Sequence, residues 1–130
     1  MDDKDWQIIR LLRENSRLSN SEIGRILNVS EGTVRKRISR MLATGAIKKF
    51  TVVTGNEGVD AIILVRLESK KTKNVIEEIR KRFDEIYEYS GRVDLAVKIN
   101  CSSLDELNSI VDSIRAIDGV RGTDTLIRLK

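Results

Sequence analysis

Basic side chains gathered in one short stretch are the residues of this sequence whose type and spacing favour a particular chemistry. Residues 31–50 contain one acid, Glu31, and six cationic side chains: Arg35, Lys36, Arg37, Arg40, Lys48 and Lys49. Residues 1–54 hold 11 Lys and Arg against 6 Asp and Glu, while residues 55–130 hold 13 against 14, so the net charge of +4 arises in the first part. A local cationic patch beside a near-neutral remainder is typical of a module that binds a polyanion, although a solvated charged surface shows the same pattern.

The residue inventory argues against catalysis and against metal binding. The chain has no histidine, which removes the commonest general base and transition-metal ligand. Its single cysteine, Cys101, builds neither a structural zinc site nor an internal disulfide. Neither the phosphate-binding pattern G-x-x-x-x-G-K-[ST] nor the dinucleotide pattern G-x-G-x-x-G occurs. We therefore expect a protein that is not an enzyme and that has no cofactor.

The apolar residues are spread too thinly for a membrane protein. No run of about 18 uncharged apolar residues is present, so we expect no membrane-spanning helix and no membrane partner. The first five residues are acidic and lack the apolar core of a signal peptide. A single cysteine suits a reducing compartment, and we expect a cytoplasmic protein.

Three helices are predicted to position the basic side chains. Apolar residues at helical spacing predict a first helix over residues 5–13. A second helix opens at Ser19, which has capping-box spacing to Glu22, and a turn over residues 28–30 follows it. The third helix then runs to about Thr44, before a glycine that is a plausible stop.

The third helix has the composition of a DNA-recognition helix. Its apolar residues, Val34, Ile38, Met41 and Leu42, lie opposite an exposed face that carries Thr33, Lys36 and Arg40, with Arg35 at its flank. A basic and hydroxyl-bearing face directly after a three-residue turn is typical of a helix-turn-helix, so we expect these four residues to contact the DNA groove. Arg37 is nearer the packed side, and an intramolecular ion pair is at least as good an interpretation of it as a DNA contact.

The pattern changes after residue 45. Residues 47–53 alternate and are rich in strand-forming side chains, which predicts the wing of a winged helix, and Lys48 and Lys49 at its start are expected to hold phosphates. Residues 55–58 then break the chain with two glycines. We place the domains at 1–54, a winged helix-turn-helix that binds DNA, and at 59–130.

The second domain is predicted to be an α+β ferredoxin-like fold of order β-α-β-β-α-β. Strands are expected over residues 60–66, 86–89, 95–99 and 120–129, with helices over 73–83 and after a capping-box sequence at Ser103. In this arrangement both helices cover one face of a single sheet. Because the strands look apolar on both faces, we expect a partner sheet to cover the other face, and thus a homodimer or a larger homo-oligomer.

Six short segments follow one another in a specific order and spacing, although none is rare by itself. They are residues 2–9, 15–19, 30–38, 45–50, 90–94 and 119–125. Together they resemble the Lrp/AsnC (feast/famine) family of bacterial and archaeal transcription regulators over nearly the whole chain. The composition, rich in Ile, Lys and Glu and free of proline and histidine, indicates an archaeal or thermophilic source.

The resemblance implies an amino-acid effector and an assembly. Such regulators dimerise through their C-terminal sheets, often form tetramers or octamers, and bind amino acids between dimers. By this resemblance the effector-binding residues are Gly91, Arg92, Asp94, Thr123 and Thr125, although turn geometry and strand propensity also account for them. An acidic group such as Asp94 or Asp124 would suit lysine, arginine or glutamine.

The function predicted from the sequence is therefore that of a sequence-specific, DNA-binding transcriptional regulator modulated by an amino acid. Two alternatives stay open. One is a nucleoid-type architectural protein that coats double-stranded DNA without an effector and with little sequence preference. The other is a small-molecule carrier or enzyme subunit whose helical domain binds protein, which the absence of salt-dependent DNA binding would favour.

Overall fold

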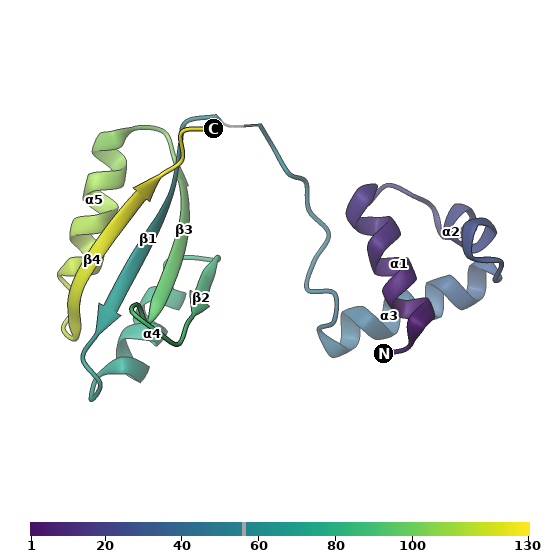
Figure 1. Ribbon diagram of the computed structural model, residues 1–130, viewed down its shortest axis with the longest axis horizontal. Coiled ribbons are helices and arrows are strands. Elements are labelled where there is room, and N and C mark those ends of the chain that lie inside the picture. Colours follow the sequence, from purple (N-terminus) through teal and green to yellow (C-terminus); the bar gives the residue numbers. More distant parts are fainter. Residues whose placement is uncertain (56) are drawn as a thin grey trace. The chain divides into compact units, whose positions relative to one another are not determined.

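The computed structural model describes residues 1–55 and 57–130, which form two compact units, Met1–Val53 and Thr54–Lys130 (Figure 1). Each unit has its own apolar core. In the described part of the chain, no helix is long and apolar enough to cross a membrane.

The first unit consists of three helices: α1 (Asp3–Glu14), α2 (Asn20–Leu27) and α3 (Glu31–Thr44). Each begins at a side chain that accepts a hydrogen bond from the helix backbone: Asp2, Ser19 and Ser30. The predicted Ser19–Glu22 capping box is present. A buried cluster of side chains from all three helices forms the core: Ile8, Leu12, Ile23, Val34 and Met41.

The α2–α3 turn brings the two helices close together. Asn28 ends α2 in the left-handed conformation, with φ of 57°, and Ser30 then caps α3 through the Thr33 amide. A side-chain carbon added at Gly24 would lie 2.6 Å from the Val29 carbonyl oxygen. The backbones of α2 and the turn therefore approach closely at Gly24, where any larger residue would push the turn away from α2.

The predicted wing strand over residues 47–53 does not form in the described structure. Gly45, with φ of 81°, ends α3, and the Ile47 amide then donates to the Met41 carbonyl oxygen at 3.0 Å. Ile47 packs against the helical core, whereas Val52 and Val53 are 76% and 99% exposed. A strand needs a neighbour to pair with, and within the described part of this unit no second strand is present.

The second unit is a four-stranded antiparallel sheet with two helices. Along the chain it runs β1 (Val59–Leu67), α4 (Thr72–Arg80), β2 (Ile86–Glu88), β3 (Leu95–Cys101), α5 (Leu104–Arg115) and β4 (Val120–Ile127). The strand order across the sheet is β2-β3-β1-β4. This confirms the predicted α+β class and the ferredoxin-like β-α-β-β-α-β arrangement (Figure 1).

Both helices lie on one face of this sheet. Val75 and Ile79 of α4, and Leu107 and Ile114 of α5, join one buried cluster with alternate side chains of the two central strands, such as Ile63. The opposite face keeps apolar residues in contact with solvent: Ile62, Tyr87 and Leu126 are 39%, 47% and 54% exposed, and Leu64 is half-buried. One face of the sheet is therefore covered by the two helices of this unit, and in the described part of the unit the other face is not.

The capping sequence at α5 forms only in part. Ser103 accepts a hydrogen bond from the Glu106 amide as expected. The Glu106 carboxylate, however, binds the hydroxyl and amide of Ser102 instead of the Ser103 amide, at 2.6 and 2.8 Å. These two hydrogen bonds, the one from the hydroxyl first, lower the pKa of Glu106.

Candidate nucleic-acid interface

The predicted DNA-contact residues on the exposed face of α3 differ in whether they have a partner within the protein. Lys36 is exposed, and no partner of its ammonium group is recorded among the described residues. Arg35 makes a solvent-exposed ion pair with Glu31 at 3.4 Å, one turn earlier in the helix. The half-buried Thr33 shares a hydrogen bond of 2.8 Å with the Ser30 hydroxyl at the helix start. Lys36 is thus the cation on this face that is most readily available to a polyanion.

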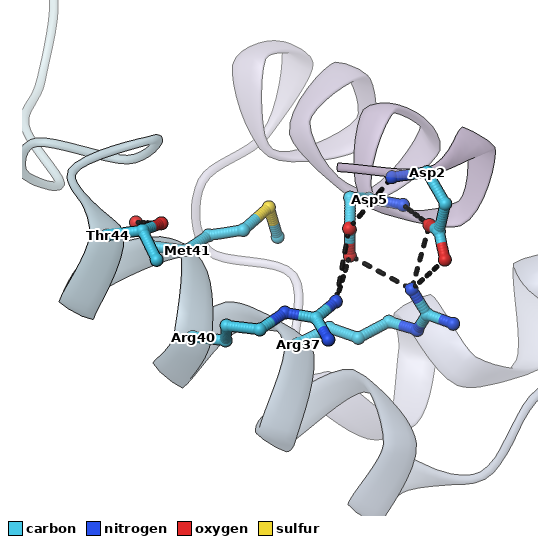
Figure 2. Close-up of polar contacts among 6 residues, drawn as sticks. All are labelled: Asp2, Asp5, Arg37, Arg40, Met41 and Thr44. Carbon is cyan, nitrogen blue, oxygen red and sulfur yellow. Dashed lines mark hydrogen bonds and ion pairs between the residues drawn. The ribbon is translucent and has the colours of Figure 1, made fainter.

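Two carboxylates of α1 face the other two arginines of α3 (Figure 2). Arg37 Nη1 donates to both Asp2 oxygens, at 2.7 and 2.8 Å, and to Asp5 Oδ1 at 3.1 Å. Arg40 Nη2 donates to the two Asp5 oxygens at 3.3 and 3.2 Å. Asp2 and Asp5 also exchange hydrogen bonds with each other's backbone amides, which completes a capping box at the start of α1. We call these four residues the α1–α3 ion cluster.

Asp5 is the centre of this cluster because its side chain is removed from water. Its side chain is only 1% exposed, whereas those of Asp2, Arg37 and Arg40 are 57%, 23% and 59% exposed. A buried carboxylate costs several kcal/mol unless charged donors surround it, and here two guanidinium groups and a backbone amide do so. The pairing therefore holds α1 against α3 at a site where a lost partner would be strongly destabilising.

The environment of the α1–α3 ion cluster shifts three pKa values in directions that favour the charged forms. The hydrogen bond from Arg37, and next the one from the Asp5 amide, lower the pKa of Asp2 to about 2. For Asp5, burial raises the pKa, but the hydrogen bonds from the Asp2 amide and from Arg37 outweigh it, so that the pKa is lowered. The hydrogen bonds to Asp2 and then Asp5 raise the pKa of Arg37.

The α1–α3 ion cluster divides the predicted DNA-binding residues into two groups. Arg37 is largely buried and satisfied by two carboxylates, which favours the intramolecular ion pair over a DNA contact. Arg40 is paired but remains mostly exposed. Lys48 and Lys49 are exposed in the segment after α3 that has no regular structure. Asp2 and Asp5 were not predicted from the sequence, although their Asp-x-x-Asp spacing before an apolar run is a capping signal.

The five predicted effector-binding residues lie in two segments of the second unit, the turn before β3 and the strand β4. Asp94 hydrogen-bonds through its amide to the Val65 carbonyl oxygen of β1, and Thr123 pairs with the same Val65 from the other side. Thr125 lies two residues further along β4. Gly91, with φ of 139°, and Arg92 are exposed in the turn that precedes Asp94. The structure therefore brings the turn and β4 to either side of one β1 residue.

The carboxylate of Asp94 already has a structural role. Its Oδ2 accepts a hydrogen bond of 2.7 Å from the Leu67 amide, where the β1–β4 pairing shifts register between Arg66 and Leu67. Asp124, the other acid considered for an effector, is paired with Arg66 at 3.2 Å. Two hollows, of about 470 and 520 Å³, lie beside α4, and their linings contain none of the predicted effector residues.

Comparison with known proteins identifies both units. The family model of the AsnC-type helix-turn-helix domain matches residues 1–42, and that of the Lrp/AsnC ligand binding domain matches residues 60–130. The chain is a member of the Lrp/AsnC family. It is a helix-turn-helix transcriptional regulator with a ligand-binding domain. Because of this second domain, the effector-independent architectural alternative is not favoured.

Relatives within the Lrp/AsnC family match along the whole chain. The HTH-type transcriptional regulator FL11 of Pyrococcus furiosus is 36% identical, with 100% of this chain and 90% of the relative covered. The regulator LysM of Saccharolobus solfataricus is 32% identical, with 100% and 94% covered. Both organisms are archaea, in agreement with the source that the composition indicated.

Solved Lrp/AsnC structures share the fold. Escherichia coli AsnC aligns with a TM-score of 0.74 at 26% identity, covering 100% of this chain and 93% of that one. The regulator NMB0573 of Neisseria meningitidis, solved as a complex with L-Met, aligns with a TM-score of 0.77 at 19% identity, covering 100% and 90%.

The lowered pKa values of the α1–α3 ion cluster predict a specific loss of stability in acid. A carboxyl with a depressed pKa in the folded state stabilises the fold above its unfolded pKa and loses that contribution as pH falls. For Asp2 the window runs from about 3.8 down to about 2. We expect the gap in thermal midpoint between the wild type and Asp2→Asn, which keeps a capping side chain, to be constant above pH 5 and to close toward pH 2.

Circular dichroism melts across this pH range measure the gap, with Asp3→Asn as the control. Asp3 is an exposed carboxyl in the same helical turn, and the described structure records no ion pair for it. A wild-type to Asp2→Asn gap that is the same at pH 5 and pH 2 would show that the ion pairs with Arg37 do not stabilise the fold.

Proposed function

We propose that this chain regulates transcription as a dimer or higher oligomer that binds a specific operator through α3 and responds to an amino acid. The observation that carries the proposal is the exposed face of α3, which presents Lys36 and Arg40 directly after the tight α2–α3 turn. We assign DNA binding to residues 1–54, and effector binding and assembly to residues 59–130.

The proposed docking places α3 in the major groove. Thr33, Arg35, Lys36 and Arg40 share the exposed face or its flank and would reach base edges or nearby phosphates. Lys48 and Lys49 follow the end of α3 and would add phosphate contacts that position the domain without reading sequence. Arg37 is better explained by its place in the α1–α3 ion cluster.

The uncovered face of the sheet supports assembly with a second copy. Ile62 and Leu64 of β1 lie beside Leu126 of the neighbouring strand β4, and Tyr87 adds a further apolar side chain from β2 at the other edge of the sheet. The ion pairs Arg66–Asp124 and Arg128–Asp60 join β1 to β4 and to the residue that follows it, beside these apolar residues. An apolar centre with a charged rim is the usual anatomy of a protein interface. A dimer formed here would carry two copies of α3 for operator half-sites about one helical turn apart.

The proposed effector is an amino acid bound near Gly91, Arg92, Asp94, Thr123 and Thr125. The Arg92 guanidinium is exposed and suits a carboxylate, and one oxygen of Asp94 remains beside the bond to Leu67. A solved relative with the same fold is a complex with L-Met, which supports an amino acid as the class of ligand. Lysine, arginine and glutamine remain the candidates that would suit an acidic group in this site.

The DNA-binding proposal predicts that Lys36→Ala weakens operator binding and leaves the fold intact. The operator is first selected from a pool of random duplexes with the wild-type protein. A lost base contact should cost about 1–3 kcal/mol and relax the sequence preference, whereas a lost phosphate contact should reduce the slope of log affinity against log salt by about 0.9. Lys73→Ala removes one exposed positive charge from α4 and serves as the matched control. Equal affinities for Lys36→Ala and Lys73→Ala would exclude α3 as the docking face.

The assembly proposal predicts that Leu126→Asp reduces the molecular mass of the particle. An aspartate on the uncovered sheet face would place a carboxylate without a partner inside the interface, which costs several kcal/mol. Leu104→Asp at the start of α5 alters a residue of the same type and similar exposure, 55% against 54%, away from that face. Light scattering after gel filtration gives the masses, and a Leu126→Asp particle as heavy as the wild type would place the interface elsewhere.

The effector proposal predicts that one amino acid, or a small chemical class of them, raises the thermal midpoint of the protein. A ligand at 100 times its Kd stabilises the folded state by about 2.7 kcal/mol. Melts with each of the twenty amino acids identify the ligand, and Arg92→Ala should lose the response while Arg115→Ala, an exposed arginine at the end of α5, should keep it. A flat panel would contradict the effector assignment and favour an effector-independent role, without touching the DNA-binding proposal.

A further inference from the structure

Asp5 is the one charged side chain that is fully buried in residues 1–55 and 57–130. It comes from α1, outside the recognition helix, yet its carboxylate contacts two arginines of α3 that lie one turn apart (Figure 2). Stability alone does not require this arrangement, since an apolar residue in such a position is often as stabilising as a buried ion pair. The geometry around Arg40 indicates a second purpose.

The two arginines of the α1–α3 ion cluster are held in different ways. Arg37 is 23% exposed and binds both Asp2 and Asp5, so its charge is paired within the protein. Arg40 is 59% exposed, and its bonds to Asp5 are made by Nη2. Within the described residues its Nη1 and Nε have no recorded partner. Arg40 therefore has one end fixed by a buried anion, while donors remain free on the same exposed face as Lys36.

A fixed arginine reads DNA differently from a free one. The guanidinium group is planar, and two parallel N–H groups at one of its edges match O6 and N7 of guanine in the major groove. In Arg40 such an edge pairs Nη1 or Nε with the second N–H of Nη2, the nitrogen that also donates to Asp5. Holding that plane before DNA arrives removes the cost of ordering a flexible side chain on binding. The carboxylate also offsets the charge of Arg40, which lowers its attraction to phosphates of any sequence.

We propose that Asp5 is a positioning residue that sets the DNA specificity of this regulator by orienting Arg40 toward a base edge and by suppressing its sequence-independent attraction to phosphate. This inference rests on the proposed function, because it requires α3 to dock in the major groove. It assigns a role in recognition to a residue of α1 that does not itself touch DNA. The expected signature is opposite changes in two affinities, which a merely structural defect would lower together.

The test compares Asp5→Asn with Asp3→Asn in the full chain. Both substitutions remove one negative charge from the first turns of α1, but only Asp5 contacts α3. Affinities are measured as a function of salt for the selected operator and for a generic duplex of the same length. For Asp5→Asn we expect the ratio of operator to generic affinity to fall roughly two- to tenfold, which is the effect of freeing one side chain. The salt slope on generic DNA should steepen by about 0.9, while Asp3→Asn keeps the wild-type ratio.

A double variant shows whether Asp5 acts through Arg40. In an Arg40→Gln background, Asp5→Asn should produce no further change in the affinity ratio. Should Asp5→Asn fail to fold, Arg40→Lys provides the test, because this exposed lysine keeps the charge but lacks the planar fork, and its ratio should fall while its melting midpoint stays near that of the wild type.

The outcomes separate this inference from the proposed function. Wild-type binding to the operator, together with a ratio that Asp5→Asn and Arg40→Lys leave unchanged, overturns the role of Asp5 and leaves the DNA-binding function standing. A ratio that falls equally for Asp5→Asn and Asp3→Asn reduces the effect to net charge and also overturns the role of Asp5. A wild-type protein without salt-dependent binding to any duplex overturns both proposals.

Discussion

A carboxylate withdrawn from water between two helices is the constraint on which the helical unit depends. Asp5 is charged at a site where only 1% of its side chain meets solvent, and this state persists only while guanidinium groups of α3 surround it. The capping box with Asp2 fixes the start of α1, and the two arginines tie that start to the middle of α3. The same contacts therefore hold the core closed and set which face of α3 remains outside.

The start of α3 is constrained by backbone geometry instead of charge. Gly24 leaves no room between α2 and the turn, Asn28 takes the left-handed conformation, and Ser30 caps α3 at once. Apolar contacts of Ile23, Val34 and Met41 fill the space that remains. The ion cluster holds the middle of α3 and the tight turn holds its start. The face of α3 that remains exposed carries Lys36 and Arg40.

Local signals in the sequence predicted most of this fold, and the failures share one physical cause. The cap at Ser19, the turn over residues 28–30, the stop at Gly45 and the order of strands and helices depend on neighbours a few residues away, so their spacing reveals them. The pairing of Asp5 with Arg37 and Arg40 spans more than thirty residues and leaves no periodic trace. The wing strand was expected from its alternation, but alternation does not supply a pairing partner, and the described unit contains none. For the candidate site, the sequence predicted which cations contact DNA, and that assignment stays a prediction. Which of them are already paired within the protein could be read only from the structure.

In the second unit, the predicted effector site and one face of the sheet both lack partners among the described residues of that unit. Asp94 and Thr123, two of the residues considered for the effector, flank Val65. One oxygen of Asp94 already accepts a hydrogen bond from the Leu67 amide, and Asp124 is paired with Arg66. Neither described hollow includes the predicted effector residues, and the sheet face that carries Ile62 and Leu126 is uncovered. In the proposed assembly, a second copy would complete both features. An amino acid that favours one arrangement of the copies would then change the spacing of two α3 helices, and its differential affinity for the two arrangements sets the largest effect it has on operator binding.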